Sequence, residues 1–299
     1  MQNKDFKSVR SFMNRFPNET ACRKYLENKR WPQGDKSCPH CKSIRKIYTY
    51  KDGITYKCAD CKKQFSLTKG TIFEKTKIPL ADWFYIIYKF VTQRKGLSSY
   101  EVSRQIGITQ PNALYMLHRI YKACGNTGER EMLEGIVEID ETFVGGKNRF
   151  RHYNKRKKGI QGRSTVDKVP IIGMLARGGN IRLLKVSRLE KKPMQTLIRN
   201  MIKHDSVVAT DEYLNYNGLN KWFHHGQCNH GAYQYVNSIF HTNTLEGAWG
   251  LFKRSIIGVH HQISRRLMRL YCNAFEFRYN HRKFETKDSF EILLSQCFG

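Results

Sequence analysis

Two pairs of closely spaced cysteines place the strongest constraint on how this chain folds. Cys38 and Cys41 form one Cys-x-x-Cys pair, and Cys58 and Cys61 form a second after sixteen intervening residues. Each pair puts two thiolates on one tight turn, and the segment between them is long enough for a β-hairpin that brings the turns together around a tetrahedral Zn²⁺. Because sulfur would fill all four ligand positions, the sequence predicts one structural zinc ion in a ribbon over residues 38–70.

Basic and aromatic residues flank the second cysteine pair. Lys57, Lys62 and Lys63 stand beside Tyr56 and Phe65. This mixture favours contact with nucleic acid. A ribbon that docks another protein fits the same pattern, so both alternatives remain open.

The net charge favours a nucleic-acid partner. The chain of 299 residues carries 53 Lys and Arg against 25 Asp and Glu, a formal net charge of +28 that is spread along the sequence. No segment approaches the run of about 18 apolar residues that a membrane span needs, and the N-terminus has no apolar core of the signal-peptide type. We therefore expect a cytoplasmic, nucleoid-associated protein without a membrane partner, whose cysteines are thiols or metal ligands.

Helical segments precede and follow the expected ribbon. Residues 1–37 predict a lead-in of two short helices, separated at Pro17 and with Asn18 as the cap of the second. Residues 71–127 predict a compact helical unit with the pattern of a helix-turn-helix around Gly107. Its second helix would present side chains that read base edges in a major groove: Gln110, Asn112, Tyr115 and Arg119. A plain helical hairpin fits the same pattern.

Residues 128–299 predict an α/β domain with a mixed sheet. Three consecutive strand-like segments are followed by a helix at about 193–204, a strand, and a helix at about 212–223. A long helix or a helix pair then fills the region from about 243 to 281. A strongly basic stretch, 147–168, predicts a loop that binds DNA phosphates through Arg151, Lys155, Arg156, Lys157 and Lys158.

Acidic residues stand at the ends of two apolar strands in this basic domain. Strand alternation in IVEIDETFVGG places Glu138 and Asp140 on one face and Glu141 on the other. In SVVATDEYLNY, Asp211 follows an apolar strand in the same way. Burying an acid costs free energy unless a cation lies beside it. A solvent-facing acid and a helix cap, respectively, are the alternatives.

The stretch HTNTLEGAWGLFKR, residues 241–254, supplies a third acid on a helix. Leu245, Ala248, Trp249 and Phe252 form its buried stripe, and a neighbouring polar stripe holds Asn243, Glu246, Gly250 and Lys253. A solvated pair of Glu246 and Lys253 is one explanation. The other is that Asp140, Asp211 and Glu246 converge to hold two divalent cations, Mg²⁺ or Mn²⁺, for phosphodiester chemistry, with Lys253 placed for DNA.

The chain resembles the DDE transposases of bacterial insertion sequences that carry an N-terminal zinc ribbon, the ISXO-type group, which are similar to the transposases of eukaryotic Merlin elements. The resemblance rests on ENKRWPQGDKSCPHC, the ribbon, VEIDETFVGGK, ATDEY and HTNTLEGAWGLFKR. It implies a ribonuclease H-like catalytic domain with Asp140, Asp211 and Glu246 as the acid triad and Lys253 as the basic residue that follows. His241 and Asn243 belong to the last block, and we expect them to line the site.

The sequence therefore predicts a transposase that binds terminal inverted repeats, cuts the element ends and joins them to target DNA, acting as a homodimer or a larger synaptic assembly on double-stranded DNA. Two alternatives remain: a DNA-binding regulator or domesticated transposase that does not cut, and a structure-selective nuclease of the same fold. The sequence assigns no role to His224, His225 and His230.

Overall fold

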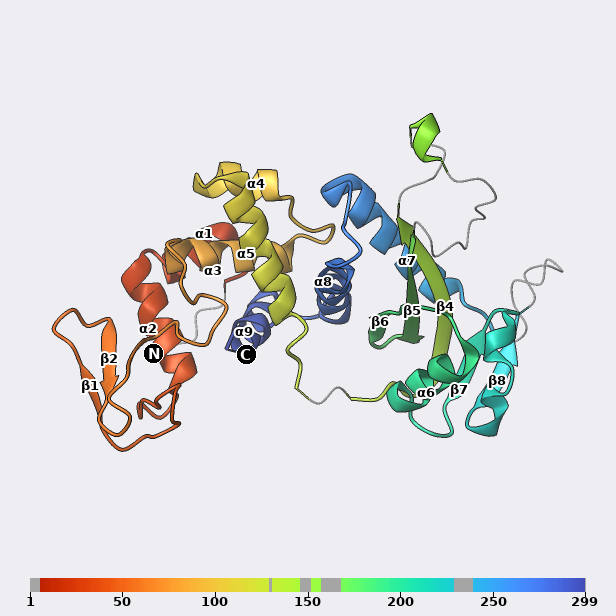
Figure 1. Cartoon of the computed structure of the whole chain (residues 1–299), viewed down its shortest axis with the longest axis horizontal. Helices are drawn as coiled ribbons and strands as arrows, with labels where there is room; N and C mark the ends of the chain where they lie inside the picture. Colours follow the sequence, from red (N-terminus) through yellow and green to blue (C-terminus); the bar gives the residue numbers. More distant parts are fainter. Residues whose placement is uncertain (1–5, 129–130, 146–151, 157–167, 229–238, 299) are drawn as a thin grey trace. The chain divides into compact units, whose positions relative to one another are not determined.

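The computed structural model describes residues 6–128, 131–145, 152–156, 168–228 and 239–298 (Figure 1). The chain forms two compact units, Met1–Asn126 with Lys283–Gly299, and Thr127–Arg282. Within the described residues, no helix combines the length and apolar character that crossing a bilayer requires.

Two short helices open the first unit: α1 (Val9–Arg15) and α2 (Glu19–Arg30). They are separated at Pro17, and Asn18 caps α2 by accepting a hydrogen bond from the Ala21 N–H at 3.0 Å, as predicted. After the end of α2, the ring of Trp31 meets that of Tyr56 edge-on, so the lead-in packs on the ribbon.

The ribbon is a small antiparallel sheet in the order β1-β2-β3: β1 (Ile47–Thr49), β2 (Thr55–Cys58) and β3 (Gln64–Ser66). The predicted hairpin is β1 with β2. In its turn, the Asp52 carboxylate accepts hydrogen bonds from the N–H groups of Ile54 and Thr55 at 2.9 and 3.0 Å. The side chain of Asp52 thus closes the turn and aligns β1 with β2, the strands that connect the first cysteine pair to the second.

Four helices complete the first unit: α3 (Leu80–Thr92), α4 (Ser99–Ile106), α5 (Gln110–Ala123) and α9 (Thr286–Gln296). Gly107 ends α4 with a φ of 67°, a left-handed conformation that glycine adopts without strain. Phe290 of α9 is fully buried and packs against Phe12 and Phe84. Whereas the sequence assigned 283–299 to the domain over 128–299, the structure packs this segment in the first unit.

The described residues of the second unit form a mixed five-stranded sheet in the order β6-β5-β4-β7-β8 (Figure 1). Its strands are β4 (Ile136–Gly145), β5 (Lys168–Ala176), β6 (Ile181–Lys185), β7 (Val207–Thr210) and β8 (His224–Gln227). β5 is antiparallel to its two neighbours, β4 and β6, whereas β4, β7 and β8 are parallel. The α/β class and the mixed sheet are confirmed; β8 was not predicted.

Helices cover both faces of this sheet. On one face lies α6 (Lys191–Met201), whose Met194 and Ile198 share a core with Val137 and Ile139 of β4. The other face is covered by α7 (Asn243–Ser255), a π-helical turn η6 (Ile256–His260), and α8 (Met268–Asn280). Leu245, Ala248, Trp249 and Phe252 of α7 are buried, as the apolar stripe predicted. The layers hold α7 against β4, the strand that carries Asp140.

The predicted helix over 212–223 is not formed. In its place are two short 3₁₀ turns, η3 (Leu214–Tyr216) and η4 (Leu219–Lys221). Asn217 has extended geometry with a ψ of 124°, and Gly218 has a φ of 100°, so the chain leaves helical geometry between the turns. This break lets Tyr216 and Leu219 enter the core beneath α6.

Candidate active site

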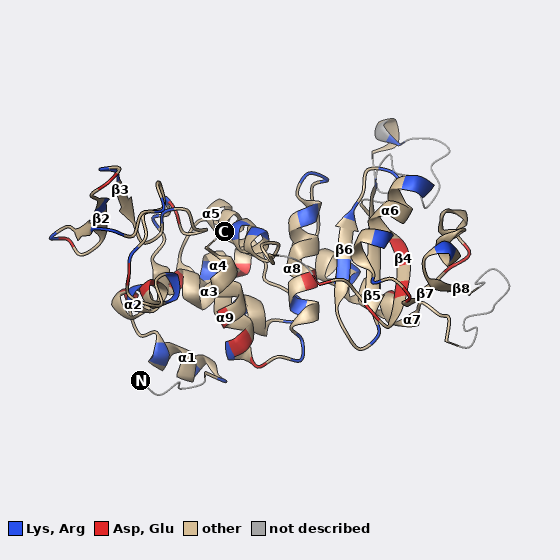
Figure 2. Ribbon diagram, turned by 90° about the horizontal axis from the view of Figure 1, so that it is seen from below, with Lys and Arg blue, Asp and Glu red and all other residues tan. Residues whose placement is uncertain are grey.

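Two of the predicted acids meet where strand β7 ends. The parallel register of β4 and β7 pairs Glu138 with Ala209, so two residues further along each strand Asp140 is level with Asp211. One carboxylate oxygen from each of Asp140, Glu141 and Asp211 lies within 4.8 Å of the others. We call these three residues the acid group; Figure 2 marks the acidic positions on β4 in red.

Glu141 is a member of the acid group that the sequence did not predict. It points to the face opposite Asp140, as alternation requires: Glu141 Oε2 accepts a hydrogen bond from the Tyr216 hydroxyl at 2.9 Å, whereas Asp140 contacts Trp249 of α7. The described pairing of β4 with β7 ends at Glu138. Beyond Glu138, Asp140 on one face of β4 and Glu141 on the other both bring a carboxylate oxygen close to Asp211. The only signal in the sequence was an acid adjacent to Asp140.

Burial and mutual repulsion disfavour the ionised form of the carboxylate of Asp140 in the acid group. Burial first, and then the negative charges of Glu141 and Asp211, raise the pKa of Asp140 to about 7. Two hydrogen bonds oppose this increase, from the Glu141 N–H at 2.8 Å and from Trp249 Nε1 at 3.0 Å. Burial, together with the charge of Glu141, also raises the pKa of Tyr216, which therefore stays a neutral donor.

A divalent cation fits this donor set. Carboxylate oxygens are the ligands that Mg²⁺ and Mn²⁺ prefer, and a cation beside three acids removes the repulsion that disfavours the ionised form of Asp140. The site is thus suited to bind a hard cation and the phosphate oxygens that such a cation binds in turn.

The third predicted acid, Glu246, lies outside the acid group, on α7. Its side chain is exposed, and its Oε1 accepts a hydrogen bond from the Thr242 hydroxyl at 3.1 Å. Two residues of α7, one before and one after Glu246, donate hydrogen bonds to side chains of β4: the Leu245 N–H to Glu138 and Trp249 Nε1 to Asp140. The structure therefore places Glu246 on the helix that contacts the acid-bearing strand, without joining its carboxylate to the other three.

Glu138 anchors the beginning of α7 to β4. Its carboxylate is fully buried and accepts hydrogen bonds from the Leu245 N–H at 2.8 Å and from Arg177 Nε at 2.6 Å. Arg177 also donates to the carbonyl oxygen of His241 at 3.0 Å, and His241 Nδ1 lies 3.5 Å from Glu138 Oε1. The sequence pattern placed Glu138 on the Asp140 face but did not indicate this role.

The remaining predicted residues of this block follow the helix surface. Asn243 is the first residue of α7 and is exposed, and Lys253 is exposed two turns after Glu246. His241 lies just before the helix beside Glu138. The polar stripe is thus formed as predicted, while the functions of these side chains stay predictions.

The four predicted zinc ligands come together. The sulfur atoms of Cys38 and Cys61 are 3.6 Å apart, as are those of Cys41 and Cys58, and all four lie within 4.8 Å of one another. Four converging sulfur atoms fit a tetrahedral Zn²⁺ with no open coordination position. Within the described part of the chain, the only other candidate group of three or more metal ligands is the acid group.

The predicted base-reading residues differ in how they are held. Asn112 and Tyr115 are exposed on α5, Tyr115 with 57% of its surface. The Gln110 amide donates to Ser99 Oγ at 2.8 Å, which ties α5 to the start of α4. DNA contact by these three residues stays a prediction.

Arg119 makes contacts within the first unit. Its guanidinium donates to the carbonyl oxygens of Ile72 and Glu74 at 2.6 and 2.8 Å and lies over the ring of Tyr115. These hydrogen bonds fix the segment before α3 against α5. Arg119 therefore has a structural role that the sequence pattern did not indicate, and its predicted contact with DNA remains untested.

Most of the predicted basic loop is outside the described residues, including Arg151, Lys157 and Lys158. Lys155 ends the short turn η2 (Tyr153–Lys155), and its side chain is also outside the described part. Arg156 is exposed. The contact of this loop with phosphates stays a prediction.

The histidines to which the sequence assigned no role lie partly on β8. His224 is exposed, and His225 Nε2 is 2.9 Å from the Thr210 hydroxyl, at the end of β7. Burial lowers the pKa of His225, which favours its neutral form as a partner of this hydroxyl. His230 is outside the described residues.

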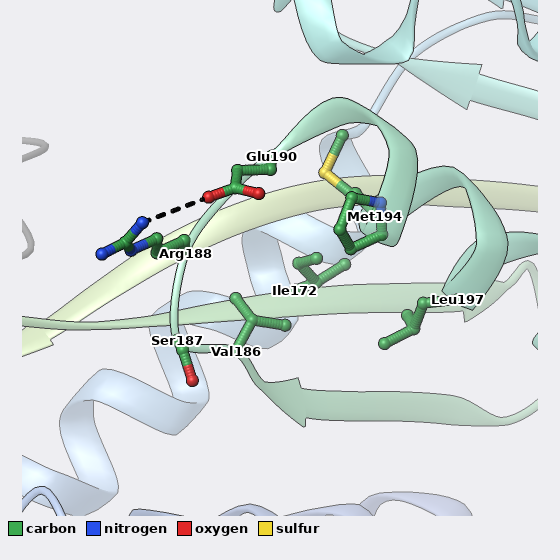
Figure 3. Close-up of a pocket in the computed structure, with 8 residues that line it drawn as sticks. Ile172, Val186, Ser187, Arg188, Glu190, Met194 and Leu197 are labelled. Atoms are coloured by element: carbon green, nitrogen blue, oxygen red, sulfur yellow. Dashed lines mark ion pairs between the residues drawn. The ribbon is translucent and has the colours of Figure 1, made fainter.

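A pocket of about 350 Å³ lies beside the start of α6 (Figure 3). Its floor includes Ile172, whose partner on β4 is Glu141, and an ion pair of Arg188 with Glu190 at 3.5 Å stands at its side. Val186, Met194 and Leu197 make the remaining wall largely apolar. None of the acid group lines this pocket, so it is separate from the candidate active site.

Comparisons with known proteins match both parts of the chain. Residues 132–280 match the family model of the ISXO2-like transposase domain, and residues 17–64 match that of the transposase zinc-ribbon domain. The chain is also 28% identical over 290 residues to a protein of Halobacterium salinarum named "Uncharacterized protein in transposable element ISH50", a match that covers 93% of this chain and 97% of that protein. The first model includes the whole acid group, and the second includes all four zinc ligands.

Proposed function

The chain belongs to the ISXO2-like transposases with an N-terminal zinc ribbon, and on that premise we propose that it is a DDE-type DNA transposase that cleaves the ends of its element and joins them to target DNA. The acid group at the end of β7 is the observation that carries this proposal, because three converging carboxylates in a chain of net charge +28 suit phosphodiester chemistry with divalent cations.

In this proposal Asp140 and Asp211 hold the cations, Glu141 supports them from the other face of β4, and Glu246 completes the ligand set from α7. Mg²⁺ or Mn²⁺ ions held by these residues would supply Lewis-acid activation of the attacking oxygen and would stabilise the leaving oxygen. Glu246 has the flexible side chain and the exposed position needed to turn toward the acid group when DNA is present. Lys253, two turns further along α7, binds a phosphate of the same DNA.

The other predicted contacts position the DNA. The zinc ribbon and the α4–α5 pair bind the terminal inverted repeats, with Asn112 and Tyr115 on the exposed surface of α5. Arg156 and the basic residues around it bind phosphates near the catalytic unit. Because two ends must be processed together, we propose a homodimer or larger assembly that acts on DNA in the bacterial nucleoid.

Cleavage of a supercoiled plasmid that carries the element ends tests the proposal. With Mg²⁺ we expect nicks at the ends, lost in Asp140→Asn and in Glu246→Gln, while both variants still shift end DNA in a gel. A Glu246→Gln protein that cuts as fast as the unaltered protein removes Glu246 from the mechanism.

The same experiment separates the two alternatives. Persistent binding with no nicks in Mg²⁺ or Mn²⁺ would indicate a DNA-binding regulator. Cleavage that proceeds equally on plasmids without the ends would indicate a structure-selective nuclease.

A further inference from the structure

Trp249 joins the helix that carries Glu246 to the strand that carries Asp140. The residue is 4% exposed, and its indole Nε1–H donates a hydrogen bond to Asp140 Oδ2 at 3.0 Å. Burial alone does not bring a partner to an indole, since Nε1 of Trp31 and of Trp83 is buried without an acceptor among the described residues. The bond to Asp140 therefore needs a structural cause.

That cause is a glycine on the neighbouring strand. Gly173 of β5 is the register partner of Asp140, and a Cβ atom at this position would lie 2.5 Å from Cζ2 and 2.8 Å from Cη2 of Trp249. Such contacts are much shorter than van der Waals separation, so any larger residue would displace the ring. The absence of a side chain at Gly173 lets the indole lie across the sheet and reach Asp140.

The hydrogen bond completes the orientation of the Asp140 carboxylate. Oδ1 accepts the N–H of Glu141 at 2.8 Å, and Oδ2 accepts the indole N–H of Trp249 at 3.0 Å. Two donors on two oxygens fix the plane of the carboxylate and leave a lone pair on each oxygen for a cation. Both donors also stabilise the ionised form, which burial beside Glu141 and Asp211 disfavours.

We propose that Trp249 is a positioning residue for the metal-binding carboxylate of Asp140, and that Gly173 leaves the space in which the Trp249 ring lies. The inference rests on the proposed function only in assigning a cation to Asp140. It connects α7 to the acid group through one hydrogen bond, because the helix that carries Glu246 also orients the Asp140 carboxylate.

Substitution of Trp249 by phenylalanine removes the N–H donor and keeps an aromatic ring in the core. Loss of a hydrogen-bond partner of a metal ligand typically weakens metal affinity by about 10–100-fold, and we expect a loss in this range. The measurement is Mn²⁺ titration calorimetry of the zinc-loaded full chain, in which the binding that Asp140→Ala abolishes identifies the relevant site.

Gly173→Ala should weaken Mn²⁺ binding in the same direction, because the ring must move away from Asp140. Its matched control is Gly258→Ala, a glycine of η6 at which a Cβ meets nothing within 4 Å. We expect the control to bind Mn²⁺ within about twofold of the unaltered protein, since an added methyl group in open space disturbs no metal ligand.

The indole proton gives a second readout in the unaltered protein. The chain has four tryptophans, so its nitrogen–proton spectrum contains four indole signals. Saturation with Mg²⁺ should shift the Trp249 signal, because the cation draws electron density from the carboxylate that accepts its hydrogen bond. The signal is assigned by its absence in Trp249→Phe or, if that variant does not fold, by replacing the other three tryptophans one at a time.

The outcomes separate the inference from the function on which it rests. Weakened Mn²⁺ binding in Trp249→Phe with a Mg²⁺-sensitive Trp249 signal supports the positioning role. Tight binding that is equal in Trp249→Phe and the unaltered protein overturns the inference and leaves the proposed transposase intact. A chain whose Mn²⁺ titration is the same with and without Asp140 overturns the cation site and the inference together.

Discussion

Replacing Glu138 by glutamine tests whether one buried carboxylate fixes α7 to β4. Glu138 has no exposed surface and accepts two hydrogen bonds, from the Leu245 N–H at 2.8 Å and from Arg177 Nε at 2.6 Å. The amide keeps an oxygen that can accept one of these bonds, but it removes the charge that strengthens both.

The expected loss of stability follows from these two bonds. A hydrogen bond to a charged group contributes about 1.5–3 kcal/mol and one between neutral groups about 0.5–1.5 kcal/mol, so Glu138→Gln should cost about 2 kcal/mol. For the unit Thr127–Arg282 this corresponds to a decrease in Tm of about 4–8 °C. Glu138→Ala, which leaves Arg177 without its buried partner, should cost about 3–5 kcal/mol.

Glu134 provides a matched control on the same protein. It pairs with Lys203, but the two side chains are 67% and 56% exposed, and exposed pairs contribute little, so Glu134→Gln should change stability by less than about 1 kcal/mol. The assay is thermal and urea unfolding of the full chain at pH 7. A Glu138→Gln protein as stable as Glu134→Gln would refute the role of Glu138 as the anchor of α7.

Three further predictions concern the metal sites and the first unit. The pKa of Asp140 is raised to about 7 in the folded state, so its protonation stabilises the fold at low pH when no divalent cation is bound beside it, and this contribution is lost as pH rises toward 7. In buffer without added Mg²⁺ or Mn²⁺ and without a chelator, so that the ribbon keeps its zinc, the stability of Asp140→Asn relative to the unaltered protein should rise by about 2 kcal/mol from pH 5 to pH 7.5 in urea unfolding, and saturating Mg²⁺ should remove this gain. Cys58→Ser should release the zinc ion, measured by elemental analysis, and unfold the ribbon without lowering the Tm of the second unit. Arg119→Ala should lower the free energy of unfolding by about 2 kcal/mol, because it removes two hydrogen bonds to backbone carbonyl oxygens. Asn112→Ala should keep stability and weaken binding to end DNA, measured by gel shift. Equal stability of the two variants would contradict the structural role of Arg119.

Local patterns in the sequence were sufficient for most of the elements and for the four zinc ligands, but not for β8 or for the segment 212–223, which forms 3₁₀ turns. Cysteine spacing predicted the four converging sulfur atoms, and helical periodicity predicted the buried stripe of α7 with Glu246 and Lys253 beside it. The position of Asp140 and Asp211 after apolar segments led to the prediction that they converge with Glu246, and the structure brings Asp140 and Asp211 together with Glu141 instead. The cysteine spacing and the helical periodicity are carried by residues a few positions apart, so the sequence alone reveals them.

The tertiary structure decided what depends on register and on side-chain direction across elements. Glu141 belongs to the acid group because the pairing of β4 with β7 ends before it. The helix α9 belongs to the first unit because Phe290 packs against aromatic rings of that unit. The bond of Trp249 to Asp140 depends on a glycine that is far away in sequence and adjacent only through the pairing of β4 with β5. No local pattern encodes such contacts, because each is set by which strands pair, where they stop and which face of a helix lies on them.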